Sequence, residues 1–262
     1  MNEPSPGQIA LLVLSAALFA VGWGLSLSRL RWDRNALRVA AKASLYWAIL
    51  VGLGVLVWHS IDRRSWLPLE DNFDTLIWLG LLLALFVMYV QRTRPLGGLD
   101  WFIIPIVILL LVCAAVFGRA KPHEYVGSTW SWVHRVSAYG GALAFAVAGA
   151  VGALYLLVSR RLHAKTAVAG PKMGSLERLE HLTFVSVTLG FALFTIGMVT
   201  GLVEMRRTQT QPAKLLLATS VWVVYAIVLH SPINPSFRGR KTAILSVIGF
   251  LLMVGTIVAV EF

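Results

Sequence analysis

Long apolar runs separated by short polar segments dominate the sequence. A helix needs roughly 20 apolar residues to cross the hydrocarbon core of a bilayer, and eight runs meet or approach that length. None of them alternates with the period of two that a barrel strand requires, so helices are expected to satisfy the backbone in lipid. The pattern predicts a single polytopic all-α membrane domain over residues 1–262, with transmembrane helices at about 8–28, 40–59, 74–91, 101–118, 136–158, 183–203, 214–230 and 242–260.

The basic residues between these runs predict the orientation of the bundle. The connections after the first, third, fifth and seventh runs hold fifteen of the 23 Lys and Arg residues: Arg29, Arg31, Arg34, Arg38, Lys42, Arg92, Arg94, Arg160, Arg161, Lys165, Lys172, Arg178, Arg238, Arg240 and Lys241. Basic loops stay cytoplasmic. Eight spans then place both termini on the outer side, which is the periplasmic side of a bacterial inner membrane.

The composition is typical of a membrane protein and excludes other classes of protein. Hydrophobic residues make up 58% of the chain and charged residues 13%, against roughly a quarter charged in a soluble domain. The net charge of +11 follows the predicted cytoplasmic loops, so we expect no nucleic-acid partner. The only cysteine, Cys113, lies in an apolar run, which excludes a disulfide framework and a CxxCH haem-attachment site.

Histidines near helix ends are the candidate chemistry. Neutral imidazole is a good axial ligand for haem iron. His134 and His230 lie at predicted helix ends with aromatic or β-branched neighbours, and His59 closes the second predicted helix. Trp130 and Trp132 precede His134, where indole rings either form a membrane-interface belt or pack on a flat cofactor. Position alone leaves both interpretations open.

Four stretches resemble the cytochrome c assembly family of CcsA-like and HemX-like membrane proteins. They follow one another in the order and spacing of that family and cover residues 40–258 broadly. The stretches are WLPLEDNFDTLIWLGLLLALFVMYVQR (66–92), WVHRVSAYGGALAFAVAGAVGALYLLVSRRL (132–162), LERLEHLTFVSVTLGFALFTIGMVTGLV (176–203) and YAIVLHSPINPSFRGRKTAILSVIGF (225–250).

The resemblance implies haem as the cofactor and places its ligands. By that resemblance His134 takes the family's outer ligand position and His230 the inner one, while Trp130 and Trp132 pack on the outer face. His59 is the remaining candidate ligand, because the family's second outer histidine has no counterpart after the last run; His123 is the other possible substitute. No residue is expected to be catalytic.

One departure from the family shifts the expected function. Members that hand haem to apocytochrome c have a tryptophan-rich segment between the helices that match the sixth and seventh runs. This chain reads EMRRTQTQPAKLL (204–216) there, without tryptophan. The chain therefore resembles the HemX-like branch more closely, and we expect it not to be an enzyme.

Three functions remain as hypotheses from the sequence. The first is an accessory protein for cytochrome c maturation or haem handling, with other assembly subunits or apocytochrome c as partners. The second is a HemX-like regulator of tetrapyrrole biosynthesis that acts through its cytoplasmic loop, where SLERLEHL (175–182) predicts a short amphipathic surface helix. The third is a structural subunit of a larger membrane complex, without a cofactor.

Overall fold

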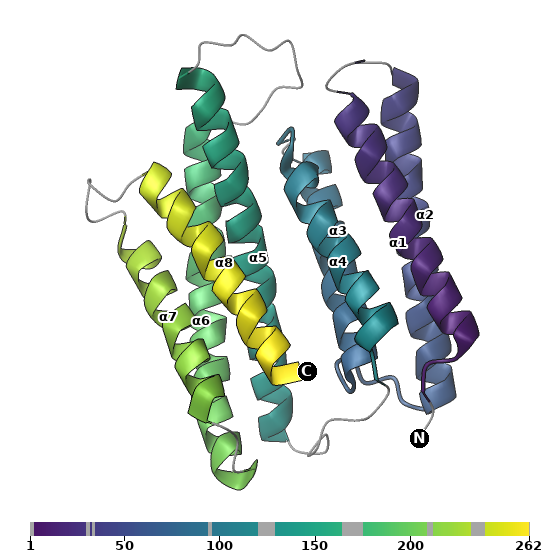
Figure 1. Cartoon of the computed structure of the whole chain (residues 1–262), viewed down its shortest axis with the longest axis vertical. Coiled ribbons are helices and arrows are strands. Elements are labelled where there is room, and N and C mark those ends of the chain that lie inside the picture. Colours follow the sequence, from purple (N-terminus) through teal and green to yellow (C-terminus); the bar gives the residue numbers. More distant parts are fainter. Residues whose placement is uncertain are drawn as a thin grey trace. The chain divides into compact units, whose positions relative to one another are not determined.

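A computed structural model describes the chain over residues 3–29, 32, 35–93, 96–119, 129–163, 175–208, 212–231 and 239–261, without the side chains of 204–208, 212–214 and 258–261. These ranges form eight α-helices (Figure 1). Their bounds are α1 Pro6–Ser28, α2 Asn35–Arg63, α3 Asn72–Thr93, α4 Leu99–Phe117, α5 Thr129–His163, α6 Leu176–Thr208, α7 Pro212–His230 and α8 Arg240–Glu261.

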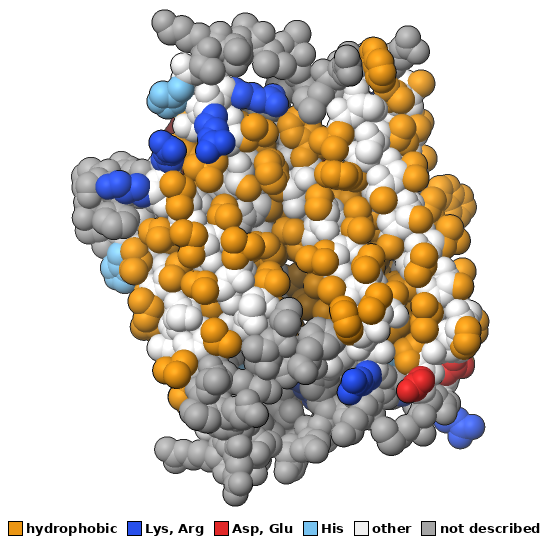
Figure 2. Space-filling model, viewed as in Figure 1, with side chains coloured by type: hydrophobic (Ala, Val, Ile, Leu, Met, Phe, Trp, Pro, Cys, Tyr) orange, Lys and Arg blue, Asp and Glu red, His pale blue; other side chains and the backbone are white. Residues whose placement is uncertain are grey.

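The helices have the length and composition of membrane spans. Seven contain at least 18 residues apolar enough to cross a bilayer, and the apolar part of α7, Leu215–His230, is shorter. Hydrophobic side chains cover the middle of the helices, whereas charged side chains lie near helix ends (Figure 2). The predicted all-α integral membrane bundle is confirmed, and its N-out, C-out orientation stays a prediction.

Two of the helices extend well beyond the predicted spans. The α5 helix includes the TWSWVHR stretch, so His134 lies inside a helix and not in the connection before it. The α6 helix begins at Leu176, so the predicted separate surface helix SLERLEHL is wrong; its residues form the first turns of α6. Polar residues at a span end keep the helical hydrogen-bond pattern in water, which an apolar window does not detect.

Contacts divide the chain into two compact units, unit 1 with α1–α4 and unit 2 with α5–α8. The single polytopic domain stays a prediction. In unit 1, small polar residues join α1 to α2: the Ser15 hydroxyl donates to the Ala48 carbonyl at 2.8 Å, and the Ser44 hydroxyl donates to the Leu18 carbonyl at 2.7 Å. Such bonds between apolar helices are typical of membrane bundles.

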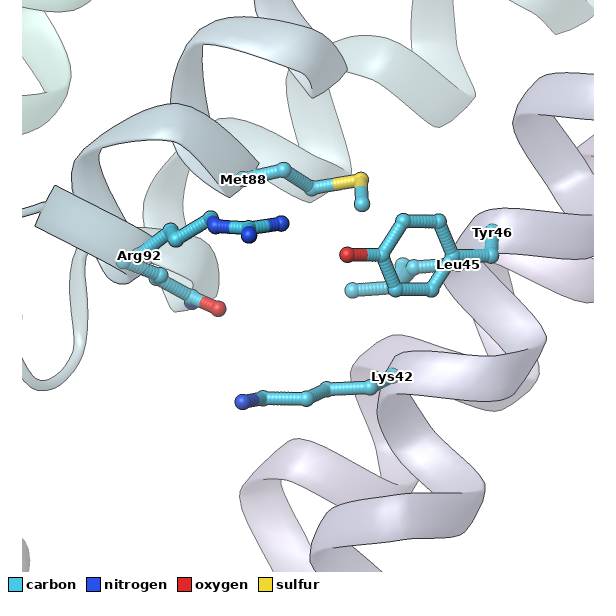
Figure 3. Close-up of a pocket in the computed structure, with 6 residues that line it drawn as sticks. Lys42, Leu45, Tyr46, Met88 and Arg92 are labelled. Atoms are coloured by element: carbon cyan, nitrogen blue, oxygen red, sulfur yellow. The ribbon is translucent and has the colours of Figure 1, made fainter.

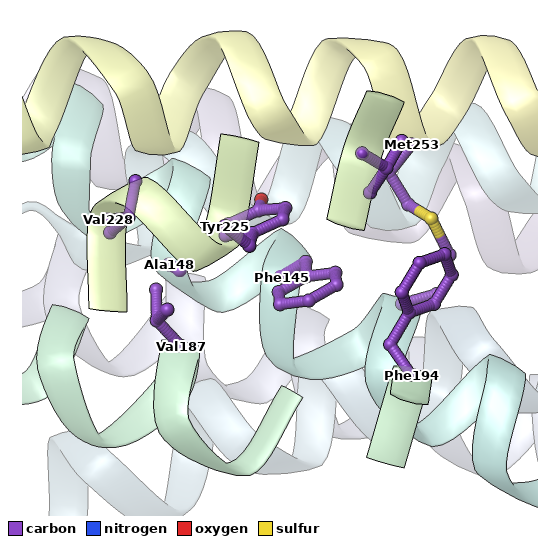
Figure 4. Close-up of a cluster of buried hydrophobic side chains, with 9 residues drawn as sticks. Phe145, Ala148, Val187, Phe194, Tyr225, Val228 and Met253 are labelled. Atoms are coloured by element: carbon purple, nitrogen blue, oxygen red, sulfur yellow. The ribbon is translucent and has the colours of Figure 1, made fainter. Parts of the chain in front are cut away.

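The core of unit 2 is aromatic and tightly packed. Phe145 of α5 stacks on Tyr225 of α7 with ring centroids 3.5 Å apart, and Phe194 of α6 meets Phe145 edge-on at 5.6 Å (Figure 4). Glycines make room for these rings: a Cβ at Gly249 would lie 2.9 Å from the Tyr225 ring. Close helix approach at small residues fixes the four helices of this unit against one another.

Candidate functional site

His134 lies on the face of α5 that packs against α6. Its ring is half-buried, and its Nδ1 is 2.7 Å from the carbonyl oxygen of Gly197, 63 residues further along the chain. A Cβ at Gly201 would lie 2.8 Å from the imidazole Cε1. The two glycines of the α6 segment GMVTG therefore supply both the acceptor and the space for the ring.

The seam between α5 and α6 continues from His134 along both helices. A Cβ at Gly197 would lie 3.0 Å from the Ala138 amide nitrogen, and one at Gly190 would lie 2.7 Å from the Phe145 ring. Larger α5 side chains thus face α6 glycines at steps of four and seven residues, the spacing of one helix face. Because the backbones approach closely on both sides of the ring, the position of His134 is set by the packing of two long helices.

The contact with Gly197 decides which nitrogen of His134 is available. A carbonyl oxygen only accepts hydrogen bonds, so the bond assigns the proton of the neutral ring to Nδ1 and leaves a lone pair on Nε2. Thr200 does not reverse this, because its hydroxyl donates to the Ile196 carbonyl at 2.7 Å and is 3.4 Å from Nδ1. No residue in the described part of the chain hydrogen-bonds to Nε2. Metal-ligating histidines have this arrangement, with the second ring N–H on a carbonyl or carboxylate.

The two tryptophans lie in the first turn of α5. Trp130 is 42% exposed and Trp132 is 37% exposed. Trp130 precedes His134 by four residues, which places the two on one face of the helix. Exposed indole rings suit an interface belt and also a flat ligand beside His134, so the predicted role of this pair stays a prediction.

His230 ends α7 and is exposed. Its Nδ1 is 2.7 Å from the Ala226 carbonyl, four residues earlier in the same helix. His163, at the end of α5, has the same local contact with the Ser159 carbonyl at 2.8 Å. The bond leaves Nε2 of His230 free for a ligand, but a helical histidine forms it without any site, so it carries less weight than the cross-helix bond of His134.

His134 and His230 lie at opposite ends of unit 2. Val228 and Ser231, on either side of His230, line one cavity with Tyr155 of α5. Tyr155 follows His134 by 21 residues on α5, a helical rise of about 30 Å. The two histidines are therefore too far apart to bind the same iron. The predicted outer and inner positions likewise call for two separate irons.

His59 has a different environment in unit 1. It is 4% exposed, and its Nε2 is 2.9 Å from an Asp71 carboxylate oxygen. Arg63, one turn later on α2, pairs with Glu70 at 2.9 Å, with Asp71 at 2.8 Å and with Asp74 at 2.8 Å. An iron on Nε2 would have to displace Asp71 from this ionic cluster. This environment suits a structural imidazole, and His59 as an iron ligand stays a prediction.

The ionic cluster sets the protonation of Asp71. Burial alone raises the pKa of this carboxyl, but the hydrogen bonds from His59, the Asp74 backbone and Arg63 outweigh it and hold the pKa below its ordinary value. Sequence reasoning missed the cluster. A detectable signal was present, since His59 and Arg63 are four residues apart on one helix and the acidic segment EDNFD (70–74) follows at once.

The described residues contain no group of three or more His, Cys, Asp or Glu side chains that could hold a bare metal ion. A haem iron needs only one or two protein ligands because its porphyrin supplies four nitrogens. A single imidazole with a free Nε2 can therefore serve as an axial ligand, and Nε2 of His134 has no hydrogen-bond partner among the described residues. His123 lies outside the described residues.

Comparison with known proteins identifies relatives of the sequence and of the fold. The family model described as Cytochrome C assembly protein matches residues 66–262. Cytochrome c biogenesis protein CcsA of Pyropia yezoensis is 35% identical over 86 residues, 31% of this chain and 27% of the relative. The CcsA protein of Thermosynechococcus vestitus is 38% identical over 78 residues, 28% of this chain and 24% of the relative. These matches span about a quarter of each relative's length.

The fold has a solved counterpart. The protein named Cytochrome c Heme Lyase CcmF superimposes with a TM-score of 0.67 at 16% sequence identity, over 100% of this chain and 50% of the CcmF chain. The chain thus spans about half the length of that protein, and the likeness concerns the fold.

One expectation from the sequence is corrected by this comparison. The expectation that the chain is not an enzyme is wrong, because the protein with the matching fold is named as a lyase. That expectation depended on the missing tryptophan-rich segment, and the shared helix arrangement does not depend on that segment. Assignment to the HemX-like branch stays a prediction. The family model matches three quarters of the sequence, so the chain belongs to the cytochrome c assembly protein family.

Proposed function

We propose that this chain handles haem during cytochrome c maturation, with His134 as an axial ligand of the iron at one end of unit 2. His230 is the proposed ligand at the other end. Trp130 and Trp132 are proposed to pack on the porphyrin face or edge beside His134. The membrane is proposed to be a bacterial inner membrane with both termini outside, and the protein partners are apocytochrome c and other assembly subunits.

One observation carries this proposal: the 2.7 Å contact between His134 Nδ1 and the Gly197 carbonyl. It fixes the tautomer and the ring orientation from a neighbouring helix, so Nε2 is presented in one direction without the entropy cost of ordering a free side chain. Bound haem would supply redox-active iron and a vinyl-bearing ring to which a partner's thiols add. The chain's part is to hold that ring at one place and orientation.

Family membership and the fold support the same function. The related proteins are named as a cytochrome c biogenesis protein and as a cytochrome c heme lyase. His134 lies within residues 66–262, the part of the chain that the family model matches. The regulator and structural-subunit hypotheses have no comparable observation among the described residues.

The experiment is a visible absorption spectrum of the protein purified from haem-replete cells. The unaltered protein should show a Soret band, and His134→Ala should weaken haem binding at least about 100-fold, because even partners of a ligand contribute 10- to 100-fold. The matched control is His163→Ala, which removes a histidine from the other end of the same helix. The control should keep the full band.

Two further variants separate ligation from folding. His134→Gly with added imidazole should regain the band, since a free ring then replaces the side chain. Gly201→Ala should weaken haem binding about 10-fold, because its Cβ would push on the ring 2.8 Å away while Nε2 is retained. A wild-type protein without a Soret band, or a His134→Ala variant with an unchanged band, would refute the proposal.

A further inference from the structure

A second site of different chemistry lies in unit 1, between α2 and α3. Its cavity of about 320 Å³ is lined by Lys42, Leu45, Tyr46, Met88, Gln91 and Arg92 (Figure 3). The lining includes two cationic side chains and two neutral hydrogen-bond donors, and no carboxylate. In Figure 3 the Lys42 ammonium, the Arg92 guanidinium and the Tyr46 hydroxyl turn towards the same space from the two helices.

The cations of this cavity have no counter-charge among the described residues. In the described part of the chain, no hydrogen bond or ion pair joins Lys42 or Arg92 to an acidic group. Two like charges that face one open space raise the local potential, which an anion between them lowers. Four donors around one space are suited to the several acceptor oxygens of a phosphate group.

The order of residues along the helices distinguishes a lipid phosphate from a free one. On α2, Tyr46 follows the cation Lys42 by one turn towards the middle of the helix; on α3, Met88 precedes the cation Arg92 by one turn in the same way. Both helices therefore present a cation towards the helix end and a larger, less polar side chain one turn deeper, and Leu45 beside them is buried. A phospholipid has the same order, with a charged headgroup at the level of the cations and an acyl chain at the level of the less polar side chains.

The predicted topology puts the cavity on the side rich in anionic lipid. Lys42 and Arg92 both belong to the basic connections that predict the cytoplasmic face. Basic pockets between transmembrane helices on that face bind acidic headgroups. We infer that the α2–α3 cavity is a binding site for the phosphate of an anionic phospholipid, held by Lys42 and Arg92 with Tyr46 and Gln91 as additional donors.

The test is native mass spectrometry of the detergent-purified full chain, titrated with phosphatidylglycerol or with phosphatidylcholine. One phosphatidylglycerol should be retained at concentrations where phosphatidylcholine is lost. Lys42→Gln and Arg92→Gln should each weaken phosphatidylglycerol binding about five-fold, and the double variant about 30-fold, from the attraction of each cation near a membrane surface. The matched control is Arg160→Gln, an exposed cation of α5 that does not line the cavity, which should change nothing.

Three results would overturn the inference. Equal retention of the two lipids would show that the cavity does not select an anionic headgroup. Equal retention of phosphatidylglycerol by the double variant and the unaltered protein would place the lipid elsewhere. Displacement of the lipid by equimolar inorganic phosphate would identify a site for a free anion. All four substituted or control proteins should unfold at the same temperature, because the altered side chains are exposed.

Discussion

The two units each hold a histidine against a neighbouring segment, but they use different nitrogens and different partners. In unit 1, Nε2 of His59 meets the Asp71 carboxylate inside a buried ionic cluster. In unit 2, Nδ1 of His134 meets the Gly197 carbonyl, and Nε2 is left without a partner among the described residues. Both residues lie near helix ends and look alike in the sequence. In each unit one ring nitrogen is held by a neighbouring segment, and the difference lies in access: His59 is buried, whereas the ring of His134 is half-buried.

The units also differ in what holds their helices together near these histidines. The cluster in unit 1 depends on opposite charges, each of which would be costly to bury alone. The seam in unit 2 depends on shape, with glycines facing larger side chains at van der Waals distance. Charge-removing substitutions should therefore affect unit 1 most, and volume-adding substitutions should affect unit 2 most.

The largest expected effect is on the ionic cluster. Arg63→Ala leaves Glu70, Asp71 and Asp74 without their shared cation, and breaking a buried pair costs about 3–5 kcal/mol. Thermal unfolding in detergent should show a large drop in Tm, whereas Arg64→Ala, at the exposed next position, should show almost none. If the first variant does not fold, Arg63→Lys, which keeps the charge, should still fold. Equal Tm values for Arg63→Ala and Arg64→Ala would mean that the cluster adds no stability.

A smaller effect is expected from adding one methyl group to the tight packing of unit 2. A Cβ at Gly152 would lie 2.8 Å from the backbone carbonyl oxygen of Ala243, which cannot yield unless α8 moves. Gly152→Ala should cost about 1–3 kcal/mol, as overpacking does elsewhere. The control is Gly54→Ala in unit 1, where a Cβ meets nothing within 4 Å, so its Tm should not fall. A Gly152→Ala variant as stable as the control would show that α5 and α8 do not depend on this close approach.

The fold could be predicted from the sequence because its main determinant is local. Each apolar run is long enough to become a span by itself, and every predicted span has its helix in the structure. Helix ends were harder to predict. The α5 helix starts at Thr129 and not near residue 136, because helical hydrogen bonds continue through polar residues.

The candidate site could be predicted from the sequence only in part. The position of His134 followed from the family motif, but its acceptor Gly197 is 63 residues away and no periodicity pairs the two. The same holds for Lys42 and Arg92, which belong to different predicted connections and line one cavity. Contacts between distant segments depend on how helices pack, and apolar windows contain no information on that packing.

The smallest expected effect concerns the part of the acid sensitivity of unit 1 that Asp71 contributes. Its pKa in the folded chain lies below the ordinary value of 3.8, so the unfolded chain binds this proton more tightly. The contribution of Asp71 to stability is therefore complete above about pH 4 and is lost as the pH falls from there through the lower folded pKa.

Unfolding in detergent from pH 3 to pH 7 should show Tm falling at the acid end. Asp71→Asn should make that fall shallower, because the substituted side chain does not titrate, while Arg63 keeps Glu70 and Asp74 as partners. Glu3→Gln removes an exposed carboxylate of the same unit and should leave the slope unchanged. If Tm falls equally steeply at acid pH in the unaltered protein and in Asp71→Asn, the acid sensitivity belongs to another group. His59 would then be held by packing against Phe73 and not by charge.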